Sequence, residues 1–484
     1  MIFTLNCCDN LRQNSIIPGL ESINQNDLMK NVDYFTGEEL DGRLSGSSGY
    51  YKAAEYAKEK FKSLRLEPAF GDKYFQPLFV EYNEIKSASL TLFNSKSDIK
   101  IFELGEDFVC RGFSGSGNFT ADAAFCGYGL SEPGLGYDDY KNIDVSGKIV
   151  IVFKQNPKWK INNLNWKQIT PRQKSAIAAE HGARGILFVS RPNDKNPQGI
   201  IGSVYSGEGE QNVNFPQLHI SKETANDFLE KTGAAISEYQ TKIDSLKTPH
   251  SILLNNKAAI KVEAEYNKRK ETVNIAAMLK GSYPVMKNEY VVVGAHLDHV
   301  GRQGEIYFPG ANDNASGSSA LLEIAEAFVV GEIEPKRSII FVLFASEEAG
   351  LFGSKYFVNT FPQPLNAITA MLNLDCIGYG DSIQVHNGKG APELWNLAKQ
   401  IDEVYTKSMI SKTWGGGGAD ATPFHERGIP SIYFVSTNSY DHLHSISDKP
   451  ETLNRELIEK ITRLAYLTVY ETAIGNYSRE EVNN

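Results

Sequence analysis

Four short runs of consecutive apolar residues stand out in the second half of the chain, at residues 290–295, 338–344, 367–374 and 430–435. Such runs, bounded by polar or turn residues, predict strands that are buried on both faces of a sheet. A predicted helix lies between the first two runs, because apolar residues at helical spacing follow Ser316, which would cap it. Alternating strands and helices predict an α/β fold with a mostly parallel mixed sheet flanked by helices.

Histidine or acidic side chains follow every one of these predicted strands. The carboxyl ends of parallel strands meet at one edge of a sheet, so these side chains are expected to converge in one crevice. They are His296 and Asp298 after the first strand, Glu347 and Glu348 after the second, Asp375 after the third, His444 in the loop after the fourth, and Asp313 in the short loop before the predicted helix.

Two histidines and several carboxylates form the ligand set of two zinc ions that share one carboxylate. Each residue alone has a simpler interpretation: a buried histidine usually has a hydrogen-bonded place in the core, and an acidic pair usually lies on a solvated surface. A single aspartate often caps a helix or forms a turn. Their joint occurrence at successive strand ends favours a metal site and therefore predicts a hydrolase.

The same residues form a series of motifs that resembles a known family. The segments 296–298, 312–317, 347–348, 375 and 444–448 contain His-x-Asp, Asn-Asp-Asn-x-Ser-Gly, Glu-Glu, Asp and His-Ser-x-x-Asp, in that order. This series resembles the co-catalytic zinc aminopeptidases and glutamate carboxypeptidases. The resemblance implies the zinc exopeptidase fold, two Zn²⁺ ions as cofactors and a peptide substrate.

Carried over residue by residue, the resemblance implies a role for each side chain. His444 fits the His-Ser-x-x-Asp motif of the family, and His442 does not. A cis peptide bond is expected after the bridging aspartate. The implied ligands are His296 and Asp375 at one zinc ion, Glu348 and His444 at the other, and Asp313 as the bridge between them.

Two further acidic residues have implied roles that do not involve direct metal binding. Glu347 would be the general base, and Asp298 would accept a hydrogen bond from the imidazole of His296 and so fix its tautomer. The chain departs from the family where Ala419 and Ala421 replace a serine and a histidine, which puts details of the pocket in doubt. The glycines at 415–418 favour either close backbone approach or a plain flexible loop.

The first half of the chain predicts an interruption of the peptidase domain. Residues 105–254 resemble a protease-associated domain, a small β-rich module without catalytic residues, so His181 and His219 are expected to be structural. The peptidase domain would then comprise residues 21–104 and 255–484. Residues 1–20 would be a tail or the remnant of a signal, and on this basis we expect an extracytoplasmic location (periplasmic, secreted or lipid-anchored).

Composition narrows the possible partners. The 484 residues carry a formal net charge of −10, which argues against nucleic acid or an anionic membrane as the main partner. The sequence contains no apolar run long enough to span a bilayer. Its five cysteines do not form a disulfide framework, and Cys110 and Cys126 are expected to be buried thiols. The oligomeric state is left open.

Three functions agree with the sequence. An aminopeptidase is the leading interpretation, because the free amine of a peptide can approach acidic side chains beside the metals. A carboxypeptidase of the glutamate carboxypeptidase type would need cationic side chains in the cleft, for which Arg302 and Lys412 are the candidates. A non-catalytic binding protein of the same fold is the third, although here every implied metal ligand is present.

Overall fold

The computed structural model describes residues 17–95, 98–204, 207 and 209–483. Of the predicted tail or signal remnant at residues 1–20, residues 1–16 lie outside the described part of the chain, whereas Ile17 and Leu20 pack in the core of the first unit. The chain forms two compact units: the first comprises the residues up to Val80, Arg269–Gly301 and Phe308 onward, and the second comprises Glu81–Lys268 and Arg302–Tyr307. These divisions differ from the predicted bounds at 105 and 254, because they fall inside two long strands, β2 (Phe75–Phe93) and β11 (Ile252–Leu279).

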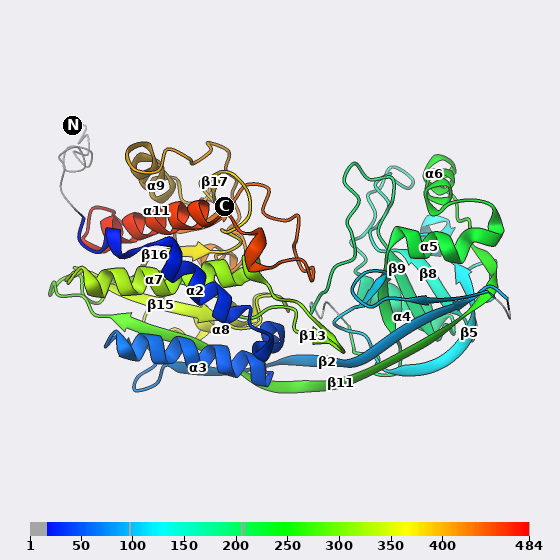
Figure 1. The fold of residues 1–484 in the computed structure, drawn as a ribbon. Helices are drawn as coiled ribbons and strands as arrows, with labels where there is room; N and C mark the ends of the chain where they lie inside the picture. Colours follow the sequence, from blue (N-terminus) through cyan, green and yellow to red (C-terminus); the bar gives the residue numbers. More distant parts are fainter. Residues whose placement is uncertain (1–16, 96–97, 205–206, 208, 484) are drawn as a thin grey trace. The chain divides into compact units, whose positions relative to one another are not determined.

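The first unit contains a mixed sheet in the order β17, β18, β16, β12, β15 and the C-terminal part of β11 (Figure 1). Strand β12 (Tyr290–His296) is parallel to both β15 (Ser338–Phe344) and β16 (Ile368–Leu374), and β16 is parallel to β18 (Ser431–Ser436). Strands β17 and β11 are antiparallel to their neighbours at the two sides. The four predicted strands and the mostly parallel mixed sheet are thus confirmed.

Alternate residues of the central strands pack against two different layers of helices. In β12, Val291 and Val293 join one apolar core, whereas Val292 joins another. The first core is formed with helices α2, α3, α7, α9 and α11, and Figure 1 shows α7 and α11 lying along the sheet. The second core is formed with the shorter helices α8 and α10. Burial on both faces explains why the sequence of these strands is continuously apolar.

Helices make up most of the remaining elements of the first unit. Ser316 stands at the N-cap of α7, but its side chain does not cap the helix; its hydroxyl donates to the Asn312 carbonyl instead, which corrects the predicted cap. The helical elements are η1 (Leu20–Ser22), α2 (Gln25–Phe35), η2 (Glu38–Arg43), α3 (Ser48–Ser63), η5 (Ala311–Ser316), α7 (Gly317–Val330), α8 (Phe352–Thr360), η6 (Leu365–Ala367), α9 (Pro392–Val404), α10 (Thr422–His425), η7 (Pro450–Thr452) and α11 (Arg455–Ala473), and the additional strands are β1 (Glu67–Pro68) and β17 (Ile383–His386).

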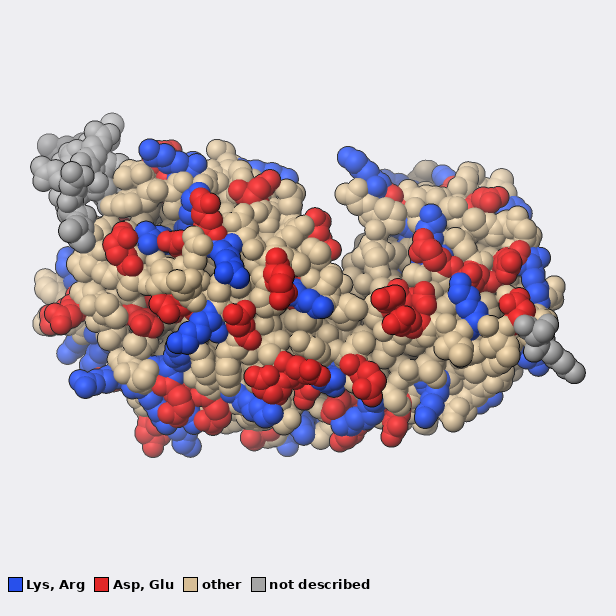
Figure 2. Space-filling model, viewed as in Figure 1, with Lys and Arg blue, Asp and Glu red and all other residues tan. Residues whose placement is uncertain are grey.

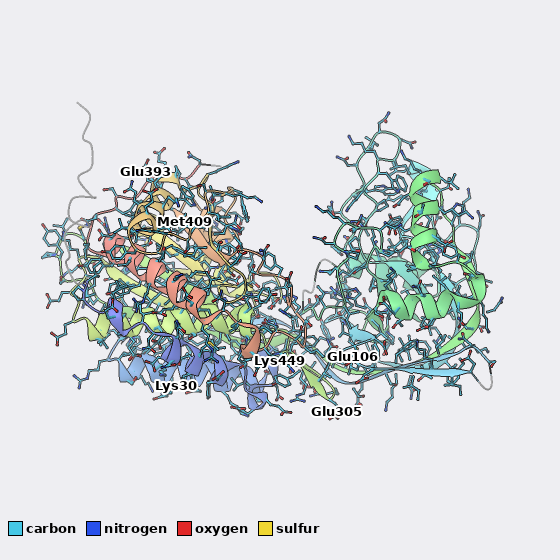
Figure 3. All side chains as sticks on the ribbon, turned by 45° about the horizontal axis from the view of Figure 1, so that its top comes forward. Lys30, Glu106, Glu305, Glu393, Met409 and Lys449 are labelled. Atoms are coloured by element: carbon cyan, nitrogen blue, oxygen red, sulfur yellow. The ribbon has the colours of Figure 1, made fainter. Side chains whose placement is uncertain are left out.

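The second unit is rich in strands, as expected for the inserted module. Strands β5, β8, β9 and β10 are parallel to one another, and β4 and the N-terminal part of β11 are antiparallel at the two sides. Figure 3 shows Glu305 in the turn between β13 and β14. The elements are β3 (Ile99–Phe102), β4 (Phe108–Cys110), β5 (Gly117–Phe125), β6 (Ser131–Glu132), η3 (Pro133–Leu135), β7 (Tyr137–Asp138), β8 (Ile149–Phe153), α4 (Pro171–Glu180), β9 (Gly185–Val189), β10 (Gln217–Ile220), α5 (Lys222–Leu229), η4 (Glu230–Thr232), α6 (Ile236–Leu246), β13 (Arg302–Gln303) and β14 (Ile306–Tyr307).

The charged side chains and the cysteines are placed as the composition leads one to expect. Acidic and basic side chains are interspersed on the face drawn in Figure 2. The cysteines of the described chain, Cys110, Cys126 and Cys376, are free and buried, which confirms the prediction for the first two. Among the described residues, no helix is both long and apolar enough to cross a membrane.

Candidate metal centre

Strand ends bring the predicted site residues together at one edge of the first unit's sheet. His296 is the last residue of β12, Asp375 directly follows β16, and Glu347 and Glu348 lie shortly after β15. Asp313 lies in η5, and the peptide bond between it and Asn314 is cis, as expected from the family resemblance.

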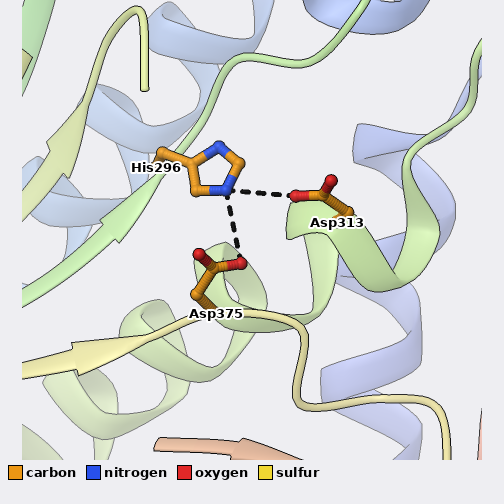
Figure 4. A group of neighbouring side chains, drawn as sticks. All are labelled: His296, Asp313 and Asp375. Carbon is orange, nitrogen blue, oxygen red and sulfur yellow. Dashed lines mark hydrogen bonds and ion pairs between the residues drawn. The ribbon is translucent and has the colours of Figure 1, made fainter. Parts of the chain in front are cut away.

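Three buried side chains form the first potential metal group (Figure 4). The Nε2 atom of His296 lies 3.2 Å from Oδ1 of Asp313 and 3.4 Å from Oδ1 of Asp375. Tetrahedral ligands at about 2.0 Å from a zinc ion are separated by about 3.3 Å. These donor atoms are therefore spaced as the ligands of one ion would be.

The second group uses the other oxygen of Asp313. The Nε2 atom of His444 lies 3.0 Å from Oδ2 of Asp313 and 2.8 Å from Oε2 of Glu348. His299, which the sequence analysis missed, joins this group: its Nδ1 lies 2.8 Å from Oε1 of Glu348 and 3.9 Å from Oδ2 of Asp313. His299, Asp313 and Glu348 form the second potential metal group of the described chain. The feature of the sequence that could have identified His299 is that it is the second histidine of the segment 296–299.

The charges of these groups fit divalent cations. Burial raises the pKa of Glu348, but the charge of His444 and its hydrogen bonds outweigh burial and hold that pKa at about 2. Burial lowers the pKa of His296, but the carboxylates of Asp375 and Glu347 outweigh it and raise that pKa well above its usual value. Carboxylates that draw protons onto buried histidines create a place where positive charge is stabilised. The donor set and its spacing both suit two cations that share Asp313.

Asp298 orients His296 through its main chain and not through its carboxylate. The Nδ1 atom of His296 lies 3.1 Å from the Asp298 carbonyl oxygen, whereas the nearest oxygen of the Asp298 carboxylate is 3.8 Å away. A proton on Nδ1 leaves the lone pair of Nε2 directed at the metal group. The carboxylate instead accepts the N–H of Glu347 at 3.1 Å. The acceptor of the His296 Nδ1–H is thus the Asp298 carbonyl and not the carboxylate that was expected. Asp298 contacts both His296 and the backbone of Glu347, the expected general base.

Glu347 lines a pocket of about 390 Å³ in the first unit. The metal-group residues Asp313, Glu348, Asp375 and His444 line the same pocket. Burial raises the pKa of Glu347 well above its usual value, and the neighbouring carboxylates of Asp420 and Asp375 add to that rise. The remaining lining residues are Cys376, His386, Trp414, Gly418, Ala419, Tyr433, Tyr440 and Leu443.

Arg43 holds the loops that carry the first metal group. Its buried guanidinium donates to the carbonyls of Leu297 (2.9 Å), Pro309 (2.8 Å) and Gly310 (3.0 Å), and also to that of Phe35. Leu297 follows His296, and Gly310 directly precedes η5, so one side chain joins the segments of His296 and Asp313. The sequence analysis assigned no such role to this arginine.

Two further backbone arrangements position the aspartate that the groups share. The Asp448 carboxylate accepts the N–H groups of Asn312 (2.8 Å) and Asp313 (3.1 Å). Gly310 has a φ of +59°, and a Cβ atom there would lie 2.3 Å from the Asp313 carbonyl oxygen, so only glycine fits.

None of the other histidines and cations singled out in the sequence belongs to a potential metal group of the described chain. His442 hydrogen-bonds to Ser447 at 2.8 Å. In the second unit, His181 stacks on Tyr140, and His219 is buried against Ser190. Arg302 belongs to the second unit, where its guanidinium lies over the Tyr307 ring.

A parallel sheet whose strand ends hold two histidine–carboxylate groups sharing one aspartate defines a metal-dependent hydrolase. Residues 274–469 match the model of Peptidase family M28, and residues 116–228, within the second unit, match the model of the PA domain.

Named relatives and a solved structure agree with this family. Aminopeptidase YwaD of Bacillus subtilis (strain 168) is 25% identical over 382 residues, which cover 76% of this chain and 71% of that protein. A probable leucine aminopeptidase of Trichophyton verrucosum (strain HKI 0517) is 30% identical over 206 residues, 41% of this chain and 58% of that protein. The structure of BSAP, a zinc aminopeptidase from Bacillus subtilis, shows the same fold with a TM-score of 0.66 and 20% identity over 97% of this chain and 99% of that chain.

Proposed function

We propose that this protein is a zinc-dependent aminopeptidase that removes N-terminal residues from peptides. The observation that carries the proposal is the charge of the pocket beside the metal groups. No lysine or arginine is among its described lining residues, and Glu347 supplies a carboxylate in addition to those of the proposed metal ligands Asp313, Glu348 and Asp375. A pocket without a basic side chain disfavours a C-terminal carboxylate, and an acidic side chain beyond the metal ligands favours the ammonium group of a peptide N-terminus.

Two zinc ions fit the donor atoms, one at His296, Asp313 and Asp375 and the other at Asp313, Glu348 and His444. His299 donates from Nδ1 to Glu348 and so orients that carboxylate. Zinc ions in such a pair lower the pKa of water and polarise a carbonyl oxygen. Mixed histidine and carboxylate ligands also suit other divalent metals, and zinc is proposed because BSAP, whose structure has the same fold, is a zinc aminopeptidase.

Glu347 supplies the proton transfer. Its carboxylate lines the pocket, takes a proton from the attacking water and delivers it to the amine that leaves. Asp298 positions it, since the Asp298 carboxylate accepts the Glu347 N–H while its carbonyl accepts the Nδ1–H of His296. General acid–base catalysis of this kind contributes about 10²–10⁴-fold in rate.

Elemental analysis of the purified protein, combined with hydrolysis of aminoacyl and N-blocked dipeptide substrates before and after chelation, tests the proposal. We expect two zinc ions per chain and chelator-sensitive cleavage of substrates with a free amine. Cleavage of N-blocked substrates alone would move the assignment to a carboxypeptidase. A protein with neither metal nor activity would be a binding protein of this fold.

A further inference from the structure

His386 lies in the pocket beside the metal groups and has no assigned role. It is the last residue of β17 and pairs directly with Tyr433 of β18 in the antiparallel register. Its side chain is 3% exposed and lines the same pocket as Glu347 and Asp375. Neither ring nitrogen of His386 has a hydrogen-bond partner within the described part of the chain.

Aromatic rings hold this imidazole in place. The Tyr433 ring stands edge-on to it, with ring centroids 4.9 Å apart and planes at 86°, and the Trp414 indole lies directly against it. Gly418 permits this packing, because a Cβ atom there would lie 2.7 Å from Cδ1 of Tyr433. Tyr440 and Leu443 complete the apolar part of the lining. The pocket therefore has a side formed by the metal groups and an aromatic side, in which both ring nitrogens of His386 are without a partner among the described residues.

The imidazole of His386 is uncharged. Burial lowers its pKa to about 3, and the positive charge of Lys412 acts in the same direction. A neutral imidazole offers one N–H donor and one nitrogen acceptor. Buried polar groups of this kind are nearly always hydrogen-bonded, so the two atoms call for a partner that enters the pocket.

We propose that His386 determines substrate specificity by hydrogen-bonding to N-terminal side chains that end in an uncharged hydroxyl or amide, as tyrosine and glutamine do. This inference rests on the proposed aminopeptidase function. The rings of Trp414 and Tyr433 contact the flat or aliphatic part of such a side chain, and His386 pairs with its tip. A charged tip is excluded, because a neutral ring among aromatic walls does not offset the cost of its desolvation.

Matched substrate pairs measure this selectivity. An analogue that leaves His386 without a hydrogen-bond partner is rejected. We therefore expect kcat/KM to be about tenfold or more higher for tyrosyl than for phenylalanyl substrates, and for glutaminyl than for methionyl substrates. In His386→Leu both ratios should approach one, and His386→Asn, which keeps a hydrogen-bonding amide, should restore part of the preference. His442→Leu, outside the pocket lining, is the control and should keep the wild-type ratios. Each ratio compares two substrates of the same variant, so it does not depend on the fraction of enzyme that is folded.

Calorimetry separates this inference from the proposed function. L-Tyrosinol and L-phenylalaninol keep the amine and the side chain but lack a scissile bond, so their binding to the zinc-loaded protein does not require hydrolysis. We expect tyrosinol to bind about tenfold more tightly to the wild type and equally to His386→Leu. Equal binding of both compounds to the wild type, or a preference unchanged in His386→Leu, would overturn the inference. A zinc-loaded protein that prefers tyrosinol but cleaves no free-amine substrate would refute the aminopeptidase function alone.

Discussion

Arg43→Lys tests whether the loops at the metal groups depend on one guanidinium. Arg43 donates four hydrogen bonds to main-chain carbonyls, and its side chain is 1% exposed. Lysine keeps the charge but has a single nitrogen, which can retain about two of these bonds. Hydrogen bonds to charged groups contribute about 1.5–3 kcal/mol each, so the loss of two lowers the free energy of unfolding by about 3 kcal/mol. For a unit of this size the melting temperature should fall by about 6 °C.

The functional consequence distinguishes Arg43 from an ordinary buried arginine. Because Arg43 binds the segments of His296 and Asp313, its replacement should weaken zinc binding about 10–100-fold. Arg337 is the matched control: it is 5% exposed and donates to the carbonyls of Thr472 and Tyr477, which lie in and after α11.

Thermal unfolding and zinc titration against a competing chelator compare the two variants. We expect Arg337→Lys to lower stability without changing zinc affinity, and Arg43→Lys to lower both. If Arg43→Lys loses stability but binds zinc as tightly as Arg337→Lys does, the guanidinium is a general structural element and the reasoning fails.

Three further predictions concern the site itself. Glu347→Gln should keep both zinc ions but lower kcat by about 10²–10⁴-fold, which steady-state kinetics and elemental analysis check together; unchanged kcat would refute the role of the base. Asp313→Ala should reduce metal content below two ions per chain, since both groups use this carboxylate, and full retention would contradict bridging. His299→Ala should weaken one of the two zinc sites about 10–100-fold without abolishing it, because it removes the hydrogen bond to Glu348; loss of all metal at that site would make His299 a ligand.

The sequence predicts the sheet and most of the site for one physical reason. Strands buried on both faces must be apolar throughout, so polar residues at their carboxyl ends are conspicuous. His296, Glu348 and Asp375 were found in this way. Arg43 and His299 were missed for other reasons: the guanidinium binds carbonyl groups that every residue carries, and the His-x-Asp motif of residues 296–298 ends one residue before His299.

The partner of His296 shows a second limit of sequence-based prediction. The family motif identifies Asp298, but only the structure separates its carbonyl from its carboxylate as the acceptor of Nδ1. The predicted domain bounds at 105 and 254 also differ from the divisions between the two units, for a related reason. Strands β2 and β11 continue from one compact unit into the other, so neither turn residues nor a change in composition marks the division.

The structure also explains how a site with this much buried negative charge can exist in a folded chain. Each carboxylate of the metal groups has a histidine neighbour that limits its repulsion: Asp313 contacts His296 and His444, Asp375 contacts His296, and Glu348 contacts His299. The Asp448 carboxylate accepts backbone N–H groups beside Asp313, which fixes the loop without adding a metal ligand. Hydrogen bonds to backbone and imidazole hold the donors at spacings that suit a cation.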